Sequence, residues 1–446
     1  MNSKVKGNQK IITLFEYDQC PYEELLDWGG DKVLEGIEGL NKSSGKQLIA
    51  LSHNYLSGTQ FVGMVQVGNV VIEVLPKIDY ALEGEVEDGQ NKSAASNLLI
   101  MLAYANNIEF DSQTLSSLKS MTGNWYELLI RFFAMELHQQ IRQGLFRNYI
   151  SREDTLKYVK GRWDISQQIK KHAYSKVDFD LTYDEFTENI LLNRLFKTIS
   201  NILLRYTRNN VSRRLLMDVR QWLGEVDEIY DFDKASFSQI LFSRLNDRFK
   251  DAYRLAKLFF EGQTLQVREG NTEAFAFVFD MNQLFEGYIT QFLVKNRKRI
   301  FQNYDSIPAV IPQFSSKSTY LAIDSQGHGK IHLRPDVVLQ HPVSKSNLLI
   351  LDTKYKKLSR QPGQNDLSPS DIYQMLAYSI RMSCDKVVLL FPQNNAGNNL
   401  NDQLWIKRDE KMTRIFVRTV NLHQPLEKEM LLIKDFRLLF KPIFGE

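Results

Sequence analysis

A chain of 446 residues exceeds what one ordinary hydrophobic core organises, and its length indicates about three domains. A hydrophobic content of 43% and an aromatic content of 11% are those of a folded globular protein, and they argue against an intrinsically disordered chain. The 56 basic and 53 acidic residues leave a net charge of only +3, so any nucleic-acid-binding surface has to be local.

Cysteine content and hydropathy indicate in which cellular compartment the protein is expected. Cys20 and Cys384 lie far apart and match no ligand spacing, so the sequence indicates neither a disulfide framework nor a zinc site. The first ten residues lack the apolar core of a signal peptide, and apolar runs such as 97–105 are shorter than the roughly 20 residues that cross a bilayer. We therefore expect a cytoplasmic protein without a membrane anchor.

Residues 1–92 are predicted to form a β-rich domain. Two strand-like runs flank Gly68-Asn69, a pair typical of a tight turn, and the polar segment 84–96 is typical of a linker. The segment 39–46, GLNKSSGK, superficially resembles a phosphate-binding loop, but five residues separate its glycines instead of four. Gln47 also stands where the Ser or Thr that holds Mg²⁺ would be. If the protein uses nucleotide energy, we expect a partner to supply it.

The hydrophobic period becomes helical across 93–270, which we predict to be a helical middle domain. Helices are expected over five segments, 95–110, 125–145, 183–206, 213–226 and 249–262, with Gly144 closing the second. The acidic start of the third, with Asp184, Glu185 and Glu188, suits the positive end of a helix dipole. Residues 146–172 carry strand-like pieces with the cations Arg152, Lys160, Arg162 and Lys170. They form either a solvated turn region or a contact surface for DNA or a partner subunit.

The third predicted domain, 271–446, alternates helices and strands. A helix is expected from about Met281, with Glu286 one position from its apolar stripe. Two strands, 333–340 and 347–356, follow as a hairpin around a polar link. Residues 368–383 then predict a second helix, capped by Ser368 or Ser370, and 385–393 a buried strand. Together the three predicted domains describe an α+β multidomain protein.

Two carboxylates and an ammonium are predicted to meet at one end of this hairpin. Asp336 stands on the first strand, and Asp352 and Lys354 stand on the second at a spacing of two. Because side chains alternate along a strand, Asp352 and Lys354 point the same way and Thr353 points into the opposite layer. This arrangement resembles the core of the PD-(D/E)xK nucleases, with Pro335-Asp336 as the PD and residues 352–354 as the D-x-K.

The resemblance implies phosphodiester hydrolysis at an oxygen-rich site for Mg²⁺, with Mn²⁺ as a possible substitute. Asp336 and Asp352 would bind the metal with the carbonyl of Thr353, and Lys354 would orient the attacking water and stabilise charge on the phosphate. Glu286 would bind the metal directly or through water. The active-site supports are expected to be Gln374 and Tyr378, which share one helix face at i, i+4.

Several segments together resemble the McrC family, the nuclease subunit of McrBC-type modification-dependent restriction systems. The specific ones are 279–288 (FDMNQLFEGY), 349–358 (LILDTKYKKL) and 372–379 (IYQMLAYS), and weaker matches at 54–79, 95–107 and 144–154 extend the resemblance over most of the chain. It implies an obligate McrB-like AAA+ GTPase partner and a double-stranded DNA substrate that is modified. Candidate DNA contacts are the basic run 295–299 and the cations Lys354, Lys356, Lys357 and Arg360.

Two other functions remain open from the sequence. A non-catalytic adaptor would keep the nuclease fold and serve to assemble or activate the AAA+ ring, although the intact set of Asp336, Asp352 and Lys354 argues against it. A self-sufficient nuclease would leave about 270 residues before the core without a role. The recognised base modification, the stoichiometry and the residue that stimulates the partner are not predicted.

Overall fold

The computed structural model describes twelve segments of the chain, residues 2–6, 9–78, 87–109, 125–172, 178–229, 234–269, 272–304, 306–313, 320–356, 367–393, 401–408 and 411–445. They form two compact units, one from residues within 1–121 and 262–446 and the other from residues within 122–261. Helices and sheets both occur, which confirms the predicted mixture of α and β structure. Among the described segments, no helix is long and apolar enough to cross a membrane.

The first unit contains an N-terminal sheet with the strand order β1-β2-β7-β6-β12-β11. Its strands are β1 (Asn2–Lys6), β2 (Gln9–Phe15), β6 (Phe61–Val67), β7 (Val70–Leu75), β11 (Gln263–Glu269) and β12 (Thr272–Asp280). The predicted turn at Gly68-Asn69 joins β6 to β7, and Gly68 takes a φ of +56° there. Gly63 is needed for a different reason, because a Cβ on it would lie 2.1 Å from the carbonyl oxygen of Phe277 on β12.

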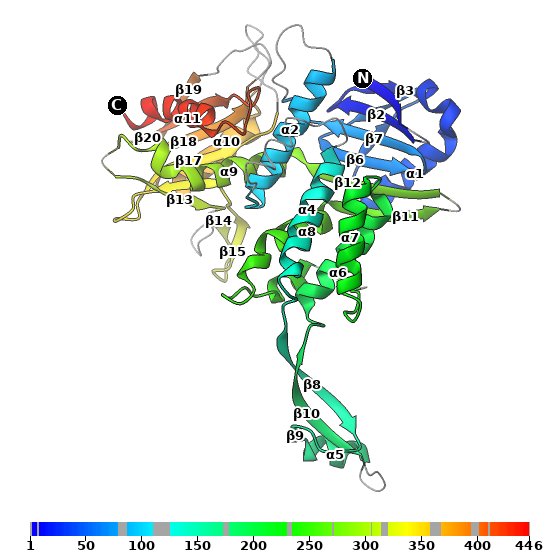
Figure 1. Cartoon of the computed structure of the whole chain (residues 1–446). Helices are drawn as coiled ribbons and strands as arrows, with labels where there is room; N and C mark the ends of the chain where they lie inside the picture. The colour runs from blue at the N-terminus through cyan, green and yellow to red at the C-terminus, as the bar shows by residue number, and fades with distance from the viewer. Residues whose placement is uncertain are drawn as a thin grey trace. The chain divides into compact units, whose positions relative to one another are not determined.

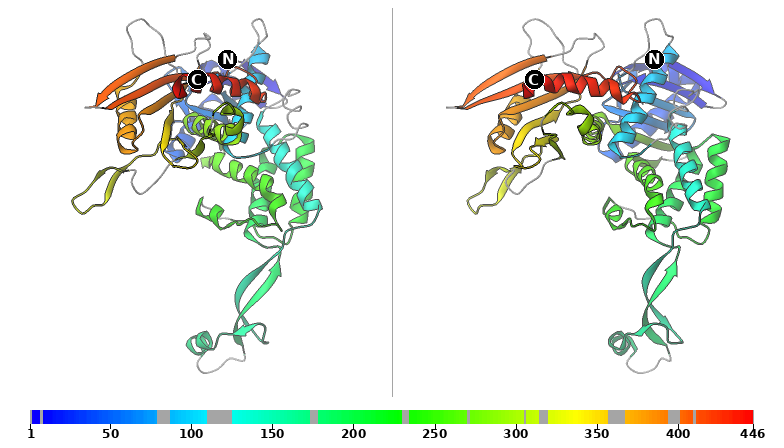
Figure 2. Two further views of the ribbon diagram at one scale, coloured as in Figure 1. Left: turned by 90° about the vertical axis from the view of Figure 1, so that its left-hand side faces the viewer. Right: turned by 60° about the vertical axis from the view of Figure 1, so that its left-hand side comes forward.

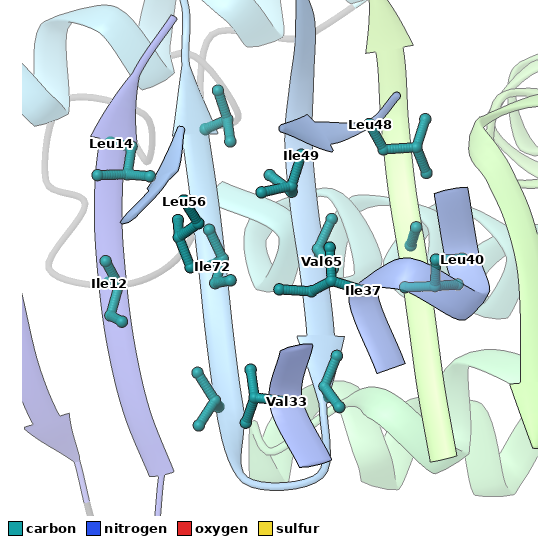
Figure 3. Packing of buried hydrophobic residues seen from close by; sticks show 14 of the residues in the cluster. Ile12, Leu14, Val33, Ile37, Leu40, Leu48, Ile49, Leu56, Val65 and Ile72 are labelled. Carbon is teal, nitrogen blue, oxygen red and sulfur yellow. The ribbon is translucent and has the colours of Figure 1, made fainter. Parts of the chain in front are cut away.

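One face of the N-terminal sheet packs on helix α1 (Gly30–Ser44), which the sequence did not predict. Figure 3 shows Val33, Ile37 and Leu40 of this helix above the strands. Around them lie β3 (Gln19–Pro21), the 3-10 helix η1 (Tyr22–Trp28), β4 (Ile49–Leu51) and β5 (Tyr55–Gly58). Burying one aliphatic side chain completely stabilises the folded protein by about 1.5–3 kcal/mol relative to leaving it exposed. Helix α1 therefore stabilises this β-rich region by covering the apolar face of its sheet. The rejected phosphate loop is the end of α1, closed by Gly45.

Helix α2 (Glu87–Ala105) begins inside the predicted linker 84–96, so the linker prediction is wrong from residue 87 onward. Tertiary packing overrides the polar composition, because the side chains of residues 93–96 are buried. Asn97 of α2 is fully buried and donates to the carbonyl oxygens of Ile78, Leu422 and Gln424. This one side chain therefore joins segments from both ends of the first unit.

The first unit also holds a C-terminal sheet with the order β13-β16-β17-β18-β20-β19. Its strands are β13 (Ala309–Pro312), β16 (Val337–Gln340), β17 (Asn347–Thr353), β18 (Lys386–Pro392), β19 (Asn401–Arg408) and β20 (Lys411–Val420). Helices α9 (Met281–Ile300), α10 (Pro369–Arg381) and α11 (Glu429–Phe444) pack on it (Figure 2), and a small hairpin of β14 (Tyr320–Ile323) and β15 (Gly329–His332) precedes β16. The predicted strand hairpin, both flanking helices and the buried strand are present, with Ser368 preceding α10. Both hairpin strands are shorter than predicted, so Asp336 and Lys354 lie one residue beyond their ends.

The second unit combines helices with a long hairpin. The helices are α4 (Trp125–Arg142), α6 (Leu191–Tyr206), α7 (Asn210–Trp222) and α8 (Lys250–Gly262), with the 3-10 helices η2 (Lys234–Gln239) and η3 (Asp247–Phe249). Strands β8 (Asn148–Leu156) and β10 (Phe179–Thr187) form an antiparallel ribbon that carries β9 (Arg162–Trp163) and α5 (Ile165–His172) at its far end (Figure 1). Gly144 follows α4 with a φ of +110°, and its N–H bonds to Ile141, as a helix-closing glycine requires.

The predicted helix 183–206 is wrong in its first part, because α6 begins only at Leu191 and residues 183–187 belong to β10. Pairing with β8 outweighs the local helix signal there, and Glu185 forms an ion pair of 2.5 Å with Arg152 across the two strands. The three-domain division 1–92, 93–270 and 271–446 stays a prediction. Strand β12 pairs across its boundaries with β6 of the first range, and β11 pairs with β12.

Candidate active site

The antiparallel register of β16 and β17 sets the two central aspartates opposite each other. Val337 pairs with Leu351 and Val338 with Ile350, so the same register continued past the end of β16 places Asp336 opposite Asp352. One step further, Pro335 faces Thr353. Side chains directly opposite in such a pair are separated by about 4.5–5.5 Å between Cβ atoms, and like charges there repel. The sequence thus creates a local excess of negative charge that a cation would relieve.

Thr353 and Lys354 donate hydrogen bonds to the two aspartates. The backbone N–H and the hydroxyl of Thr353 both donate to Oδ2 of Asp336, at 2.7 and 2.6 Å. Lys354 Nζ lies 2.8 Å from Oδ2 of Asp352, a residue that is only 2% exposed. Asp352 and Lys354 therefore share the face of β17 that turns toward α10.

A chain of hydrogen bonds then fixes Lys354 on the neighbouring helix. Its ammonium donates to Oε1 of Gln374 at 3.1 Å, and the amide of Gln374 donates to the hydroxyl of Tyr378 at 2.7 Å. Tyr378 in turn donates to the carbonyl oxygen of Arg334 at 3.0 Å, next to the Pro335-Asp336 pair. The spacing of four residues on α10 puts both polar groups on the helix face that meets the strand end.

Glu286 lies in the same neighbourhood but bonds to a different residue. Its Oε1 accepts a hydrogen bond of 3.1 Å from the amide of Gln313, whose backbone N–H donates to the carbonyl oxygen of Asp336 at 2.8 Å. Burial raises the pKa of the Glu286 carboxyl, and the charge of Asp336 raises it further. Gln313 therefore links α9 to the aspartate strand. It follows β13 without any recognisable motif, which is why sequence reasoning missed it.

Burial and the closeness of the carboxylates shift the pKa values of the residues at the strand end. Burial, followed by the charge of Asp336, raises the pKa of Asp352 to about 7. Burial likewise raises the pKa of Asp336, against the two hydrogen bonds from Thr353. Burial alone would lower the pKa of Lys354, but the neighbouring carboxylates, Asp352 above all, raise it above the ordinary value. The ammonium thus stays charged at neutral pH.

The donor atoms at this point fit a hard divalent cation that takes few protein ligands. Asp336 and Asp352 present carboxylate oxygens, and the carbonyl of Thr353, the last residue of β17, lies beyond the paired residues of the register. Within the described segments, no three His, Cys, Asp or Glu side chains are grouped closely enough to hold a metal by themselves. A cation here would therefore depend on two carboxylates, one main-chain carbonyl and water.

Some of the cations that were predicted to contact DNA form ion pairs within the protein. Lys356 donates to Oδ2 of Asp371 in the first turn of α10 at 2.6 Å. In the basic run 295–299, Arg299 and Lys295 both approach Glu429 of α11, at 2.6 and 3.5 Å. Lys357 and Arg360 lie outside the described residues.

Comparison with known proteins adds the family. A model of the McrBC 5-methylcytosine restriction system component matches residues 56–392. The chain is similar, at 22% identity and a TM-score of 0.61, to a chain in a refined half-complex from a tetradecameric assembly of Thermococcus gammatolerans McrB AAA+ hexamers with bound McrC. That match covers 97% of this chain and 100% of the other.

A second match is to the cryo-EM structure of the Thermococcus gammatolerans McrBC complex, at 25% identity and a TM-score of 0.46, covering 64% of this chain and 88% of the other. No protein with curated annotation matches. The family model spans well over half of the sequence, and the chain therefore belongs to the McrBC 5-methylcytosine restriction system component family.

Proposed function

We propose that this chain is the Mg²⁺-dependent DNA endonuclease subunit of a McrBC-type restriction system, with a PD-(D/E)xK active site. The observation that carries the proposal is the meeting of Asp336, Asp352 and Lys354 at one strand end, with the 2.8 Å contact between Lys354 and Asp352. A structural ion pair needs only one carboxylate. Two aspartates beside one lysine, Asp352 buried and Asp336 half-buried, instead match the needs of phosphodiester hydrolysis.

Each residue has a role that follows from its contacts. Asp336, Asp352 and the carbonyl of Thr353 would hold Mg²⁺ or Mn²⁺, which when bound supplies an activated water and neutralises phosphate charge. Lys354, kept charged and held by Gln374, would orient the attacking water and stabilise the developing negative charge. Tyr378 holds Gln374 from the other side. Glu286, whose pKa is raised by burial, would bind the metal directly or through water.

The proposal includes an AAA+ GTPase partner of the McrB type. Its support is the family membership and the fold shared with a chain of the assembly in which McrC is bound to McrB AAA+ hexamers. The chain's one loop-like glycine motif, 39–46, lies largely within α1, so it does not follow a strand as a phosphate-binding loop would. The 5-methylcytosine in the family's description indicates modified double-stranded DNA as the substrate.

The test is reconstitution. The chain is co-purified with a McrB-type AAA+ GTPase and assayed on methylated and unmethylated plasmid with GTP and Mg²⁺. The proposal predicts cleavage of the methylated plasmid that needs GTP, Mg²⁺ and both proteins. Cleavage by the isolated chain at physiological salt would favour a self-sufficient nuclease, and a complex that turns over GTP but never cuts would favour an adaptor.

A further inference from the structure

Tyr355, the residue after Lys354, connects the C-terminal sheet to the N-terminal sheet. Its ring lies 5.7 Å from that of Phe285 on α9, measured between centroids. Its hydroxyl donates a hydrogen bond of 2.7 Å to Oε2 of Glu16, a residue 339 positions away in the sequence. Lys354 contacts Gln374 of α10, whereas Tyr355 contacts Phe285 of α9 and Glu16.

Glu16 is a fixed anchor for this contact. It follows β2 directly, is 2% exposed, and its backbone N–H bonds to the carbonyl oxygen of Leu75 at the end of β7. The same Oε2 atom also accepts the backbone N–H of Lys77 at 3.1 Å. Lys77 Nζ in turn pairs with Asp18 at 2.9 Å, and Asp18 accepts from the N–H of Phe15, so the chain on either side of Glu16 is held.

The Lys354 end, by contrast, lies outside the regular strand pairing. Strand β17 ends at Thr353, and the register with β16 cannot continue as a hydrogen-bonded ladder because Pro335 lacks an N–H. The backbone N–H of Lys354 bonds to Leu390 of β18, and its carbonyl oxygen accepts the N–H of Lys356 at 3.0 Å. Tyr355 lies between these two bonds, so the contacts of its side chain add to what sets the direction of the backbone beyond Thr353.

We propose that Glu16 and Tyr355 are positioning residues of the nuclease site. Their hydrogen bond fixes the backbone beyond Thr353 and thereby aims the Lys354 ammonium at Asp352 and Gln374. The N-terminal sheet is then a structural part of the catalytic site, so a displacement at the carboxyl end of β2 would change the aim of Lys354. This inference rests on the proposed nuclease function.

The experiment uses the full-length chain in complex with its AAA+ GTPase and measures the kcat and KM of plasmid cleavage. Tyr355→Phe keeps the ring against Phe285 and removes only the hydroxyl. We expect kcat to fall about tenfold with KM for DNA unchanged, since a hydrogen bond to a charged acceptor is of that size. The matched control is Tyr22→Phe, which removes a tyrosine hydroxyl that donates to the carbonyl oxygen of Ser52 at 2.5 Å. It should leave kcat unchanged.

The acceptor side gives an independent check. Glu16→Gln retains an acceptor oxygen and should keep most of the wild-type kcat. Glu16→Leu has no acceptor, and its kcat should be about tenfold lower than that of the wild type. Both changes remove the bond between Tyr355 and Glu16, and Glu16→Leu also removes the acceptor of the Lys77 N–H. Glu16→Leu combined with Tyr355→Phe should therefore be no slower than Glu16→Leu alone. If Glu16→Leu does not fold, Tyr355→Phe and its control decide the matter.

The outcomes separate this inference from the proposed function. Wild-type kcat in Tyr355→Phe, or an equal loss in Tyr22→Phe, overturns the positioning role. Asp352→Ala serves as the reference in the same assay. If Asp352→Ala abolishes cleavage but Tyr355→Phe cleaves at the wild-type rate, only the positioning role is wrong. If Asp352→Ala cuts at the wild-type rate, the nuclease site itself is wrong.

Discussion

Replacing Asp352 with Asn should change how the stability of the metal-free protein depends on pH. Burial and the charge of Asp336 raise the pKa of Asp352 from 3.8 to about 7. A group whose pKa is raised on folding stabilises the native state below its unfolded pKa, and that contribution is lost as pH rises through the folded pKa. The wild-type protein should therefore lose stability between about pH 4 and pH 7.

The magnitude follows from the size of the shift. About three pKa units at about 1.4 kcal/mol each correspond to about 4 kcal/mol across this window. Asp352→Asn cannot ionise, so its free energy of unfolding relative to the wild type should rise by that amount from pH 4 to pH 7. The contact with Lys354 favours the ionised carboxyl and is already included in the pKa of about 7, so it adds no separate contribution. The change between the two pH values is therefore what tests the reasoning.

The assay is denaturant unfolding in EDTA at several pH values, repeated with Mg²⁺, for the wild type and two variants. A bound cation favours the ionised aspartate, so Mg²⁺ should reduce the wild-type loss. Asp324→Asn is the control, because backbone hydrogen bonding from His328 lowers the pKa of that carboxyl, and it should not reproduce the gain. Parallel pH profiles for the wild type and Asp352→Asn in EDTA would refute the raised pKa.

Two further outcomes concern the metal and the helix support. Cleavage should require Mg²⁺ or Mn²⁺, whereas Ca²⁺ should support DNA binding without cutting because it relaxes the geometry of attack; full activity in EDTA would exclude the site. Gln374→Leu removes the acceptor that orients Lys354 and should lower the single-turnover cleavage rate about tenfold. DNA binding measured in Ca²⁺ should be retained. An unchanged cleavage rate would show that Gln374 has no part in the mechanism.

The local patterns of the sequence predicted the strand end of the candidate site well. The alternation in 347–356 fixes which side chains share a face, and the spacing of Gln374 and Tyr378 fixes one helix face, so these contacts follow from short-range geometry. Contacts that depend on long-range pairing could not be predicted in this way. No local signal places Tyr355 against Glu16.

The same limit explains the errors in the fold. The acidic stretch with Asp184 and Glu185 has the composition of a helix start, but pairing with β8 makes it a strand. Strands β11 and β12 join the N-terminal sheet from the far side of the second unit in sequence. A deletion of residues 1–92 would therefore remove four of that sheet's six strands, and it would test folding instead of partner contact.

The most direct test of the nuclease assignment is to measure GTP turnover and DNA cleavage together in a complex that carries Lys354→Ala. The account predicts that the variant assembles with the AAA+ partner, stimulates its GTP turnover as the wild type does, and cleaves methylated plasmid about a thousandfold more slowly, for a loss of roughly 4 kcal/mol of transition-state stabilisation. Cleavage by Lys354→Ala at the wild-type rate would contradict it.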